Sequence, residues 1–519
     1  MFITTAIDYT NAPPHIGHAY EKVLADAIAR YRRLKGEQVY FLTGVDQHGQ
    51  KVQQAAEKEG IPPLAFAERI SASFLALWEK LGVEPDGWAK TTDPRHALAV
   101  RKILQSLYEK GDLYKAAYAG FYSVRQEQFL TEKERGPDGE FGPEWGQVIE
   151  IEEENWYFRL SSYGEWLNRF VEARPDFVLP NFRRAELLNA IGKVSGDLCI
   201  SRPKTRLAWG IELPFDPLYV TYVWFDALIN YLSFAGYLAE PDAGLPDFSE
   251  LWNPRALHVI GKDILSPPHG IYWPIMLHAI GFPDDRMPQL LVHGWWNLGG
   301  AKMSKTLGNV VDPSALADKY GAECLRYALL RDIATGHDAD FSEDRLRQRY
   351  NADLANDLGN LLNRTLNMIQ RYRSGVVVKS NGEGPLSGLA AQMAGTYRQR
   401  FDEFQVHSAL EAIWSFISEC NAFVEKSAPW KLAKDTARSA ALDGVLYDLA
   451  ESLRIIAVLV SPVLPKAARS MFDQLRVTEE PSLGNASWGG LPDAHAVGSP
   501  SPLFPRLDED TPPLKASGR

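Results

Sequence analysis

The first 43 residues alternate between strand-like and helix-like patterns. Residues 1–9 form a short apolar run, apolar side chains recur at helical spacing over residues 23–34, and residues 39–43 are typical of a second strand. A strand, a helix and a strand in this order predict a βαβ unit, and therefore a parallel sheet that binds ligands at the carboxyl ends of its strands. We expect the substrate site just after Tyr9 and Thr43.

The rest of the chain changes character twice. From about residue 112 the pattern becomes irregular, with an acidic, glycine-rich stretch at residues 126–154, and we predict an insertion at residues 113–205. After Asp332 apolar residues recur at helical spacing almost without a break, which predicts a separate helical bundle. The C-terminal residues are rich in Pro, Ser, Gly and Asp, a composition typical of an extended tail.

The chain is acidic, but its charge is unevenly distributed. It holds 55 Lys and Arg against 66 Asp and Glu, a net charge of −11, which argues against a generally basic nucleic-acid binder. Residues 127–154 hold ten acids and two bases, and residues 477–519 hold six acids and three bases, so these stretches contribute −8 and −3. The remainder is neutral overall and can still present a locally positive face to a polyanion.

Length, apolar content and cysteine usage limit the class of protein. With 45% hydrophobic residues in 519, the chain can build a large core and about three to four domains. Cys199, Cys324 and Cys420 lie far apart, which excludes a disulfide scaffold and a CxxC motif. No stretch approaches the ~18 apolar residues of a membrane helix, and no basic region precedes an apolar one at the start. We expect a cytoplasmic protein without membrane contact.

The first motif that carries chemistry follows the first strand. Residues 9–18 read YTNAPPHIGH, which places His15, Gly17 and His18 at the start of the next helix. A helix N-terminus offers unpaired N–H groups and a positive dipole end to phosphate, and Gly17 lets a nucleotide approach the backbone. Two imidazoles three residues apart can both donate to phosphoryl oxygens. Two capping or surface histidines are the alternative.

The second motif is GGAKMSKTLGN at residues 299–309. Mobile glycines followed by Lys302 and Lys305 suit a loop that closes on a polyphosphate. The two ammonium groups and the Ser304 hydroxyl would then stabilise a leaving pyrophosphate. A solvated surface loop is the alternative.

Together the two motifs resemble the paired HIGH and KMSKS signatures of class I aminoacyl-tRNA synthetases. HIGH stands at His15–His18, and a near-complete KMSKS stands at Lys302–Thr306. The closer resemblance, over about residues 1–475, is to the methionyl-tRNA synthetase family. It rests on Ile7, Tyr9, GVDQHG at Gly44–Gly49, ISRPK at Ile200–Lys204, YVWFDALINY at Tyr222–Tyr231 and GKDIL at Gly261–Leu265.

The resemblance implies a fold class. It is an α/β protein in which a Rossmann-type parallel-sheet catalytic domain carries an inserted connective domain and is followed by an all-α anticodon-binding helical bundle. The implied segments are a catalytic domain in two halves (1–112 and 206–290), the insertion (113–205), a KMSKS loop with a stem-contact region (291–335), the anticodon-binding bundle (336–475) and an extended tail (476–519).

The resemblance also implies an activity. Members of the family join L-methionine to tRNA(Met). The methionine carboxylate attacks the α-phosphorus of ATP carrying Mg²⁺, which releases pyrophosphate and forms methionyl-adenylate. The methionyl group then passes to the 3'-terminal ribose of the tRNA. No covalent nucleophile is needed, because catalysis is mostly positioning and charge stabilisation. The implied catalytic residues are His15, His18, Lys302 and Lys305.

Nucleotide binding is assigned in the same way. Asp263, in GKD, matches the family residue that hydrogen-bonds the ATP ribose, as carboxylates do in nucleotide-binding folds generally. The implied ATP site comprises His15, Gly17, His18, Gly261, Asp263, Lys302, Ser304 and Lys305.

The implied methionine site combines a carboxylate with an aromatic pocket. Asp46, at the end of the second strand, is placed to pair with a substrate ammonium, although an Asp in a strand-ending turn is the alternative. Trp224, Ala227 and Tyr231 share one helical face, which is usually core, but a flexible thioether packs well against aromatic rings. The resemblance assigns methionine binding to Ile7, Tyr9, Asp46, Trp224, Ala227, Leu228, Tyr231, Ile264 and His269.

Two positions near this pocket stay open. Between Leu265 and His269 the sequence reads SPP, longer by a residue or more than the family segment, so the assignment of His269 is open. Arg202 matches a family arginine near the substrate, and a structural salt bridge is the alternative.

The insertion departs further from the family. In many relatives it carries a zinc knuckle built from Cys-x-x-Cys and Cys-Pro-x-His, but the matching positions here are Ser123, Gln126, Gly142 and Trp145. None of these is a usual zinc ligand, so we predict no structural zinc and read the acidic side chains nearby as solvated surface. Hydrogen bonds and packing should hold the hairpin instead, with contributions from Trp145, Trp156 and Tyr157.

In the helical region, Asn360 and Arg364 are one helical turn apart, and Trp430 follows Pro429 near the start of another helix. Recognition of bases in single-stranded loops uses a stacking ring, a guanidinium and an amide, and these residues match the family's anticodon-reading positions. Each is more often structural when taken alone, since a helix-end Trp packs and an Asn with an Arg one turn later is a common surface pair.

Two rival functions remain. Another class I synthetase for an apolar or sulfur amino acid would share both signatures, but Asp46, Trp224 and Tyr231 argue against it. An inactive tRNA-binding paralogue is the other, and the intact histidines and lysines of the motifs argue against that. The insertion is too short for an editing domain, so discrimination falls on the methionine pocket. We expect a monomer.

Overall fold

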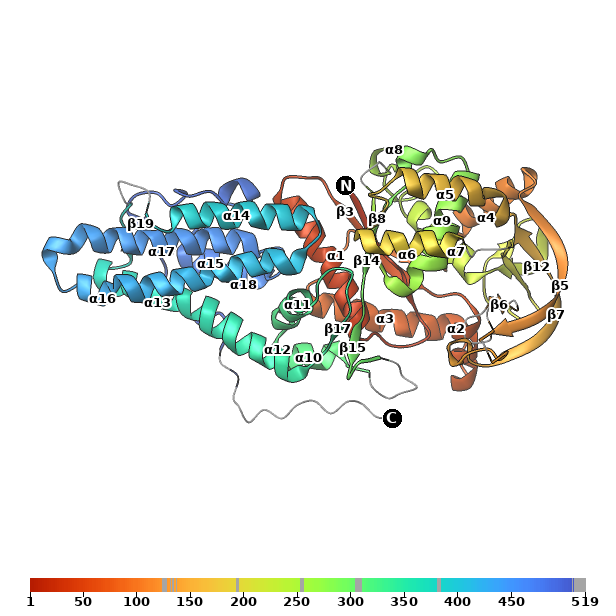
Figure 1. The fold of residues 1–519 in the computed structure, drawn as a ribbon, viewed down its shortest axis with the longest axis horizontal. Coiled ribbons are helices and arrows are strands. Elements are labelled where there is room, and N and C mark those ends of the chain that lie inside the picture. Colours follow the sequence, from red (N-terminus) through yellow and green to blue (C-terminus); the bar gives the residue numbers. More distant parts are fainter. Residues whose placement is uncertain are drawn as a thin grey trace.

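The structure is a computed structural model that describes residues 1–123, 128–130, 132, 135–136, 138–192, 196–252, 256–303, 310–379, 384–505 and 507. Figure 1 shows an elongated molecule, with a helical bundle (blue) at one end and a sheet-containing body at the other. Helix α1 (Ile16–Leu34) lies between them. In the described part of the chain, no helix combines the length and the apolar character needed to cross a bilayer.

A parallel sheet is the frame of the larger body, as predicted. Within the described residues its order is β2-β3-β1-β13-β14-β8, with β4 paired to β3. The chain runs from β1 to β3 on one side and from β13 to β14 on the other, so β1 and β13 meet at a switch point, where such sheets bind ligands. The strands are β1 (Phe2–Thr5), β2 (Asp8–Tyr9), β3 (Tyr40–Asp46), β4 (Gly87–Lys90), β8 (Val178–Leu179), β13 (Leu257–Gly261) and β14 (Gln289–His293).

Helices connect and cover the strands. Gly60 and Gly82 end two of them at φ of 68° and 65°, the left-handed conformation that glycine adopts without strain. Asp93 caps another, because its side chain accepts from the backbone N–H of Arg95. Besides α1, these helices are α2 (Gln50–Glu59), α3 (Pro63–Leu81), α4 (Pro94–Glu109), α7 (Val223–Ser233), α8 (Phe248–Leu251) and α9 (Trp273–Ala279).

The region predicted as an insertion, residues 113–205, is only partly separate from the sheet. A long antiparallel ribbon of β5 (Leu113–Ser123) and β7 (Val148–Phe158) projects at the end of the molecule opposite the bundle (Figure 1). The same range, however, contains β8, which pairs in parallel with β14, and α6 (Asn181–Ile191) packs on β8. A strand of two residues is too short to show a periodic pattern, which explains why the sequence did not reveal it. The remaining elements of this range are β6 (Gln128–Leu130), α5 (Gly164–Ala173), β9 (Leu198–Cys199) and β10 (Ser201–Pro203), and β10 pairs beyond the range with β12 (Asp216–Thr221), which also pairs with β11 (Glu212–Leu213).

One buried arginine joins the two bodies. Arg326 on α11 (Ala322–Arg331) is fully buried, and its guanidinium donates to Asp26 Oδ2 of α1 at 2.6 Å. It also donates to the carbonyl oxygens of Leu81 at the end of α3 and of Val463 in the bundle, at 3.3 and 2.9 Å. The other strands and α-helices between β14 and the bundle are β15 (Trp296–Leu298), β16 (Ala301–Lys302), α10 (Pro313–Tyr320), β17 (Ala339–Asp340) and α12 (Glu343–Arg349).

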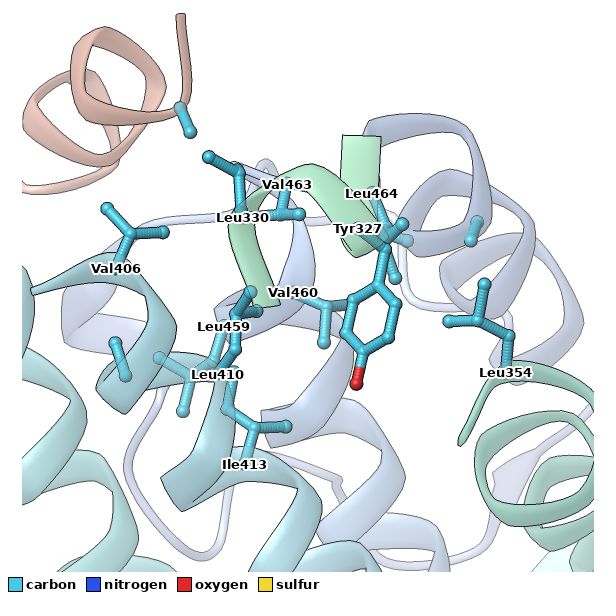
Figure 2. Packing of buried hydrophobic residues seen from close by; sticks show 14 of the residues in the cluster. Tyr327, Leu330, Leu354, Val406, Leu410, Ile413, Leu459, Val460, Val463 and Leu464 are labelled. Atoms are coloured by element: carbon cyan, nitrogen blue, oxygen red, sulfur yellow. The ribbon is translucent and has the colours of Figure 1, made fainter. Parts of the chain in front are cut away.

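The helical bundle predicted after Asp332 is present. Figure 2 shows its core where α11 enters, with Tyr327 and Leu330 near Leu410 and Leu459 of two bundle helices. The bundle also holds the far end of α1, because Tyr31 Oη donates to Asp402 Oδ1 at 3.1 Å. Its helices are α13 (Asn360–Arg373), α14 (Ser387–Asp402), α15 (Val406–Ser427), α16 (Pro429–Leu432), α17 (Ser439–Val460) and α18 (Pro465–Leu475).

The prediction of an extended tail is wrong for residues 476–505, which fold back on the bundle. Glu451 of α17, fully buried, accepts from the backbone N–H groups of Gly490 and Leu491 at 2.7 and 3.0 Å. Arg454 donates to the Ser487 carbonyl at 2.6 Å. Polar groups of α17 hold these residues on the bundle. Because a polar composition is also typical of an unpacked tail, the composition did not indicate that the segment docks. A short sheet adds to it, formed by β18 (Val376–Val377) and β19 (His495–Ala496).

Candidate active site

Two imidazoles cap the helix that follows β2. His15 is the N-cap of α1, and its Nδ1 accepts from Gly17 N at 3.0 Å, while His18 Nδ1 accepts from His15 N at 3.1 Å. Their ring centroids are 3.8 Å apart. Because each Nδ1 accepts a backbone hydrogen, each neutral ring carries its own hydrogen on Nε2. Capping and donation to a ligand, which the sequence left as alternatives, are therefore compatible in the same side chains.

A cleft of about 260 Å³ opens at the switch point between β1 and β13. It brings together eight residues predicted for the ATP and methionine sites, and Met303 of the second motif adds to its wall. The side chain of Lys302, and all of Ser304 and Lys305, lie outside the described residues. The eight are Ile7, Tyr9, His15, Gly17, His18, Gly261, Asp263 and Ile264.

A buried ionic network that the sequence did not reveal lies beside this cleft. Lys22 of α1, with a fully buried side chain, donates to Asp8 Oδ1 at 2.6 Å and to Glu21 Oε1 at 2.8 Å, and Glu21 Oε2 lies 3.0 Å from His293 Nε2. Burial raises the pKa of Asp8 to about 7, although Lys22 opposes the shift. Asp8 Oδ1 lies 4.0 Å from His18 Nε2, so the network adjoins the imidazole pair. No local pattern indicated this network, because Asp8, the pair Glu21 and Lys22, and His293 come from three separate elements.

His269 contacts three other residues predicted for the methionine pocket, which are Trp224 and Tyr231 of α7 and Ile264. Tyr231 Oη lies 2.8 Å from His269 Nε2, and His269 Nδ1 lies 2.9 Å from the Ile264 carbonyl oxygen. A carbonyl only accepts, so Nδ1 carries the hydrogen and Nε2 accepts from Tyr231. The Trp224 ring meets the His269 ring edge to face at 6.3 Å. Ala227 and Leu228 are buried in the same helix.

The segment before His269 has an irregular backbone. Residues 265–272 are π-helical except at Ser266, whose extended φ and ψ of −123° and 129° interrupt the helix. With the longer SPP segment in place, His269 contacts Tyr231. Its part in binding methionine stays a prediction.

Acid should destabilise the fold through His269. Burial lowers the pKa of His269 to about 4, whereas the unfolded side chain titrates near 6.5, so only the unfolded chain takes up a proton between these values. The buried neutral His269 makes its full contribution to the free energy of unfolding above pH 6.5. This contribution is lost as the pH falls toward 4, by up to about 3 kcal/mol. Urea unfolding between pH 4.5 and 7.5 should show a flatter pH dependence for His269→Gln than for the parent. Parallel curves would contradict this.

Asp46 ends β3 beside Tyr9 and is 6% exposed. Its Oδ1 accepts from the backbone N–H of His48 at 3.2 Å and from Thr91 Oγ1 at 3.3 Å. These contacts match the turn-forming role that was the alternative for this residue, and they also fix the carboxylate in place. Arg202, by contrast, packs its guanidinium over the Tyr222 ring at 4.6 Å.

Comparison with known proteins places the chain among aminoacyl-tRNA synthetases. The family model described as "tRNA synthetases class I (M)" matches residues 1–138 and 145–366, and "Anticodon binding domain of methionyl tRNA ligase" matches residues 381–513. The methionine–tRNA ligase of Caldanaerobacter subterraneus subsp. tengcongensis is 42% identical over 98% of this chain and 79% of its own length. That of Bacillus subtilis is 41% identical over 98% and 78%.

The chain belongs to the methionyl-tRNA synthetase family.

Solved structures agree with this membership. Mycobacterium tuberculosis methionyl-tRNA synthetase in complex with methionyl-adenylate matches with a TM-score of 0.90 at 39% identity, over 97% of this chain and 99% of that chain. The apo form of the same enzyme matches with a TM-score of 0.84 at 36% identity, over 99% and 98%. The predicted fold class, a class I synthetase sheet followed by a helical anticodon-binding domain, is confirmed.

Three residues predicted to read an anticodon lie on the helical bundle of this methionyl-tRNA synthetase family member. Asn360, exposed, begins α13, and Arg364 follows one turn later and pairs with Glu425 near the end of α15 at 2.6 Å. Trp430, five residues beyond Glu425, is 36% exposed on α16. Figure 1 places α16 at the outer end of the bundle, away from the sheet.

The described residues at the positions of the family's zinc knuckle, Ser123, Gly142 and Trp145, offer no usual zinc ligand. Ser123 Oγ donates to the Trp145 carbonyl at 2.5 Å, so this hydroxyl ties the hairpin together, and Gly142 has no side chain; Gln126 lies outside the described residues. The Phe121 and Phe141 rings pack on each other with centroids 5.1 Å apart, and the Arg135 guanidinium lies over both, at 4.5 and 4.4 Å. Among the described residues, no group of His, Cys, Asp and Glu side chains could hold a metal ion.

Proposed function

We propose that this chain is a methionine–tRNA ligase that activates L-methionine with ATP and transfers it to the 3'-terminal adenosine of tRNA(Met). The observation that carries the proposal is the convergence of the imidazole pair, Asp263 and Ile264 on one cleft at the switch point of the sheet. This is where a nucleotide and an amino acid would meet for adenylate formation.

The nucleotide would bind along the imidazole side of the cleft. With Nδ1 engaged in capping, the Nε2–H groups of His15 and His18 would donate to the phosphates, at a helix N-terminus that favours negative charge. Gly17 is needed there, because a Cβ would lie 2.9 Å from His15 Cε1. Asp263 would bind the ribose, and Mg²⁺ would enter on ATP as part of the substrate. Gly261, Lys302, Ser304 and Lys305 would complete the ATP site.

Methionine would bind between Asp46 and α7. Its ammonium would pair with the Asp46 carboxylate, and its thioether would lie against the rings of Trp224 and Tyr231. A pocket whose polar atoms are paired with one another, as Tyr231 Oη and His269 Nε2 are, favours a side chain that brings no hydrogen-bonding group. Ile7, Tyr9, Ala227, Leu228 and Ile264 would form the rest of the wall.

Amino-acid-dependent exchange of pyrophosphate into ATP tests the proposal. Exchange with methionine is expected to exceed exchange with leucine or cysteine by a wide margin. Exchange with one of those amino acids but not with methionine would contradict the proposed specificity for methionine. No exchange with any amino acid would contradict the proposed synthetase activity.

The outer end of the bundle would bind the anticodon through Asn360, Arg364 and Trp430. Removing the ring by Trp430→Ala should lower kcat/KM for tRNA(Met) by about tenfold to a hundredfold, the usual cost of losing a base stack, and leave pyrophosphate exchange unchanged. Aminoacylation assays with a matched tRNA of altered anticodon provide the control, because the variant should discriminate less between the two. An equal loss on both tRNAs would contradict the assignment.

Other parts of the proposal are the absence of structural zinc and a monomeric, cytoplasmic enzyme. The Ser123–Trp145 bond and the cluster of Arg135 with the Phe121 and Phe141 rings support a knuckle that needs no metal. Metal analysis of the purified chain tests this, and one zinc per chain would contradict it. Sedimentation of the same sample tests the monomer.

A further inference from the structure

A buried carboxylate lies on the face of α7 that points away from the methionine pocket. Asp226 is fully buried, with Oδ2 2.6 Å from His48 Nδ1 and Oδ1 2.7 Å from His96 Nε2. His96 Nδ1 lies 2.7 Å from Ser233 Oγ, also on α7. At 3.6 residues per turn, Trp224, Ala227 and Tyr231 fall on the opposite face of the helix. Asp226 therefore cannot touch a ligand in the pocket.

The same carboxylate reaches the other half of the methionine site. His48 lies two residues after Asp46, and its backbone N–H donates to Asp46 Oδ1 at 3.2 Å. One residue thus binds Asp226 through its ring and Asp46 through its backbone. His96, on α4, anchors the assembly from a third element.

Both hydrogen bonds of this assembly are accepted by an ionised carboxylate, that of Asp226. Burial alone would raise the pKa of Asp226, but His48 and His96 outweigh it and lower that pKa, so the carboxylate is ionised and accepts from both rings. The Trp209 ring lies edge on against His48 at 5.3 Å, and the Phe234 ring stacks on His96 at 6.1 Å. These rings exclude water, and in such surroundings short charge-assisted bonds hold geometry more tightly than apolar contacts do.

We propose that Asp226, bound by His48 and His96, is a positioning residue that sets the separation between the Asp46 carboxylate and the aromatic pocket of α7, and so selects methionine by length. The inference rests on the proposed function. An amino acid is measured between two fixed points, its ammonium and the end of its side chain. Weakening the hydrogen bonds of Asp226 with His48 and His96 should let the pocket accept homologues of methionine that are one methylene shorter or longer.

Asp226→Asn is the test, since it keeps the shape and removes the charge. Pyrophosphate exchange should show a KM for methionine raised by about tenfold or more, with the KM for ATP within about twofold of the parent. The ratio of kcat/KM for methionine to that for ethionine should fall by a similar factor. Asp353→Asn is the matched control, because Asp353 is a buried carboxylate bonded to Tyr327 and Arg349 far from the pocket, and it should leave that ratio unchanged.

A pair of variants at His48 distinguishes a loss of positioning from misfolding. Asn places an amide donor where Nδ1 lies, so His48→Asn should retain most of the selectivity that His48→Ala loses. An unchanged methionine-to-ethionine ratio in Asp226→Asn, or parallel losses for methionine and ATP with a lowered Tm, would overturn the inference and reduce the cluster to a structural support. A parent protein without methionine-dependent exchange would instead overturn the proposed function.

Discussion

Replacing His15 with Asn should lower the rate of methionyl-adenylate formation by about a hundredfold to a thousandfold without weakening the fold. His15 Nδ1 caps α1 by accepting from Gly17 N, and Asn is among the best N-cap residues, so its amide oxygen takes over that bond. What Asn lacks is a donor at the position of Nε2. The expected loss is the cost of one preorganised donor to phosphoryl oxygens that gain charge in the transition state.

Stability and activity should therefore separate at this residue. Thermal unfolding of His15→Asn should give a Tm at or above that of the parent, while His15→Ala should lower both Tm and activity. Rapid-quench measurement of adenylate formation supplies the rate. A His15→Asn variant with nearly full activity would show that His15 serves the helix alone.

The second large effect is expected at Asp46. Asp46→Asn keeps the oxygen that accepts from His48 N and Thr91 Oγ1 but removes the charge that would face the methionine ammonium. Removing one partner of a desolvated charged pair leaves the other uncompensated, so kcat/KM for methionine should fall by about a hundredfold or more. The KM for ATP should stay near its parent value in pyrophosphate exchange.

An inhibitor without the ammonium isolates this effect. The inhibition constant of 4-(methylthio)butyrate, which keeps the thioether and the carboxylate, should be the same for the parent and for Asp46→Asn. An inhibition constant that rises as much as the methionine KM would mean that the substitution damages the pocket itself, and the ammonium assignment would be wrong.

Local patterns were enough to predict much of this molecule. The alternation over residues 1–43 predicted the parallel sheet and the place of the cleft, because a βαβ unit fixes which strand ends meet. The imidazole spacing predicted a helix start, and the spacing of Trp224 and Tyr231 predicted a shared face. Each of these depends on neighbours within a few residues.

What could not be predicted depends on partners distant in the chain. Glu21 and His293 are separated by 272 positions, and neither carries a local sign that the other is its partner. The docking of the tail depends in the same way on Glu451 and Arg454, which look like surface residues of an amphipathic helix until their contacts are known. Buried polar pairs of this kind leave no period in the sequence.

Arg326 sets a limit on how this chain can be divided. Its guanidinium is satisfied only when α1, the end of α3 and the turn before α18 are all present, and it has no access to water. A fragment without the bundle would expose the guanidinium and remove its acceptor at the Val463 carbonyl, which weakens the setting of the Asp26 pair on the helix that carries the imidazoles. Chimeras between relatives should therefore exchange α1, α11 and the bundle as one inherited unit, because a boundary between them separates a charge from its bonds.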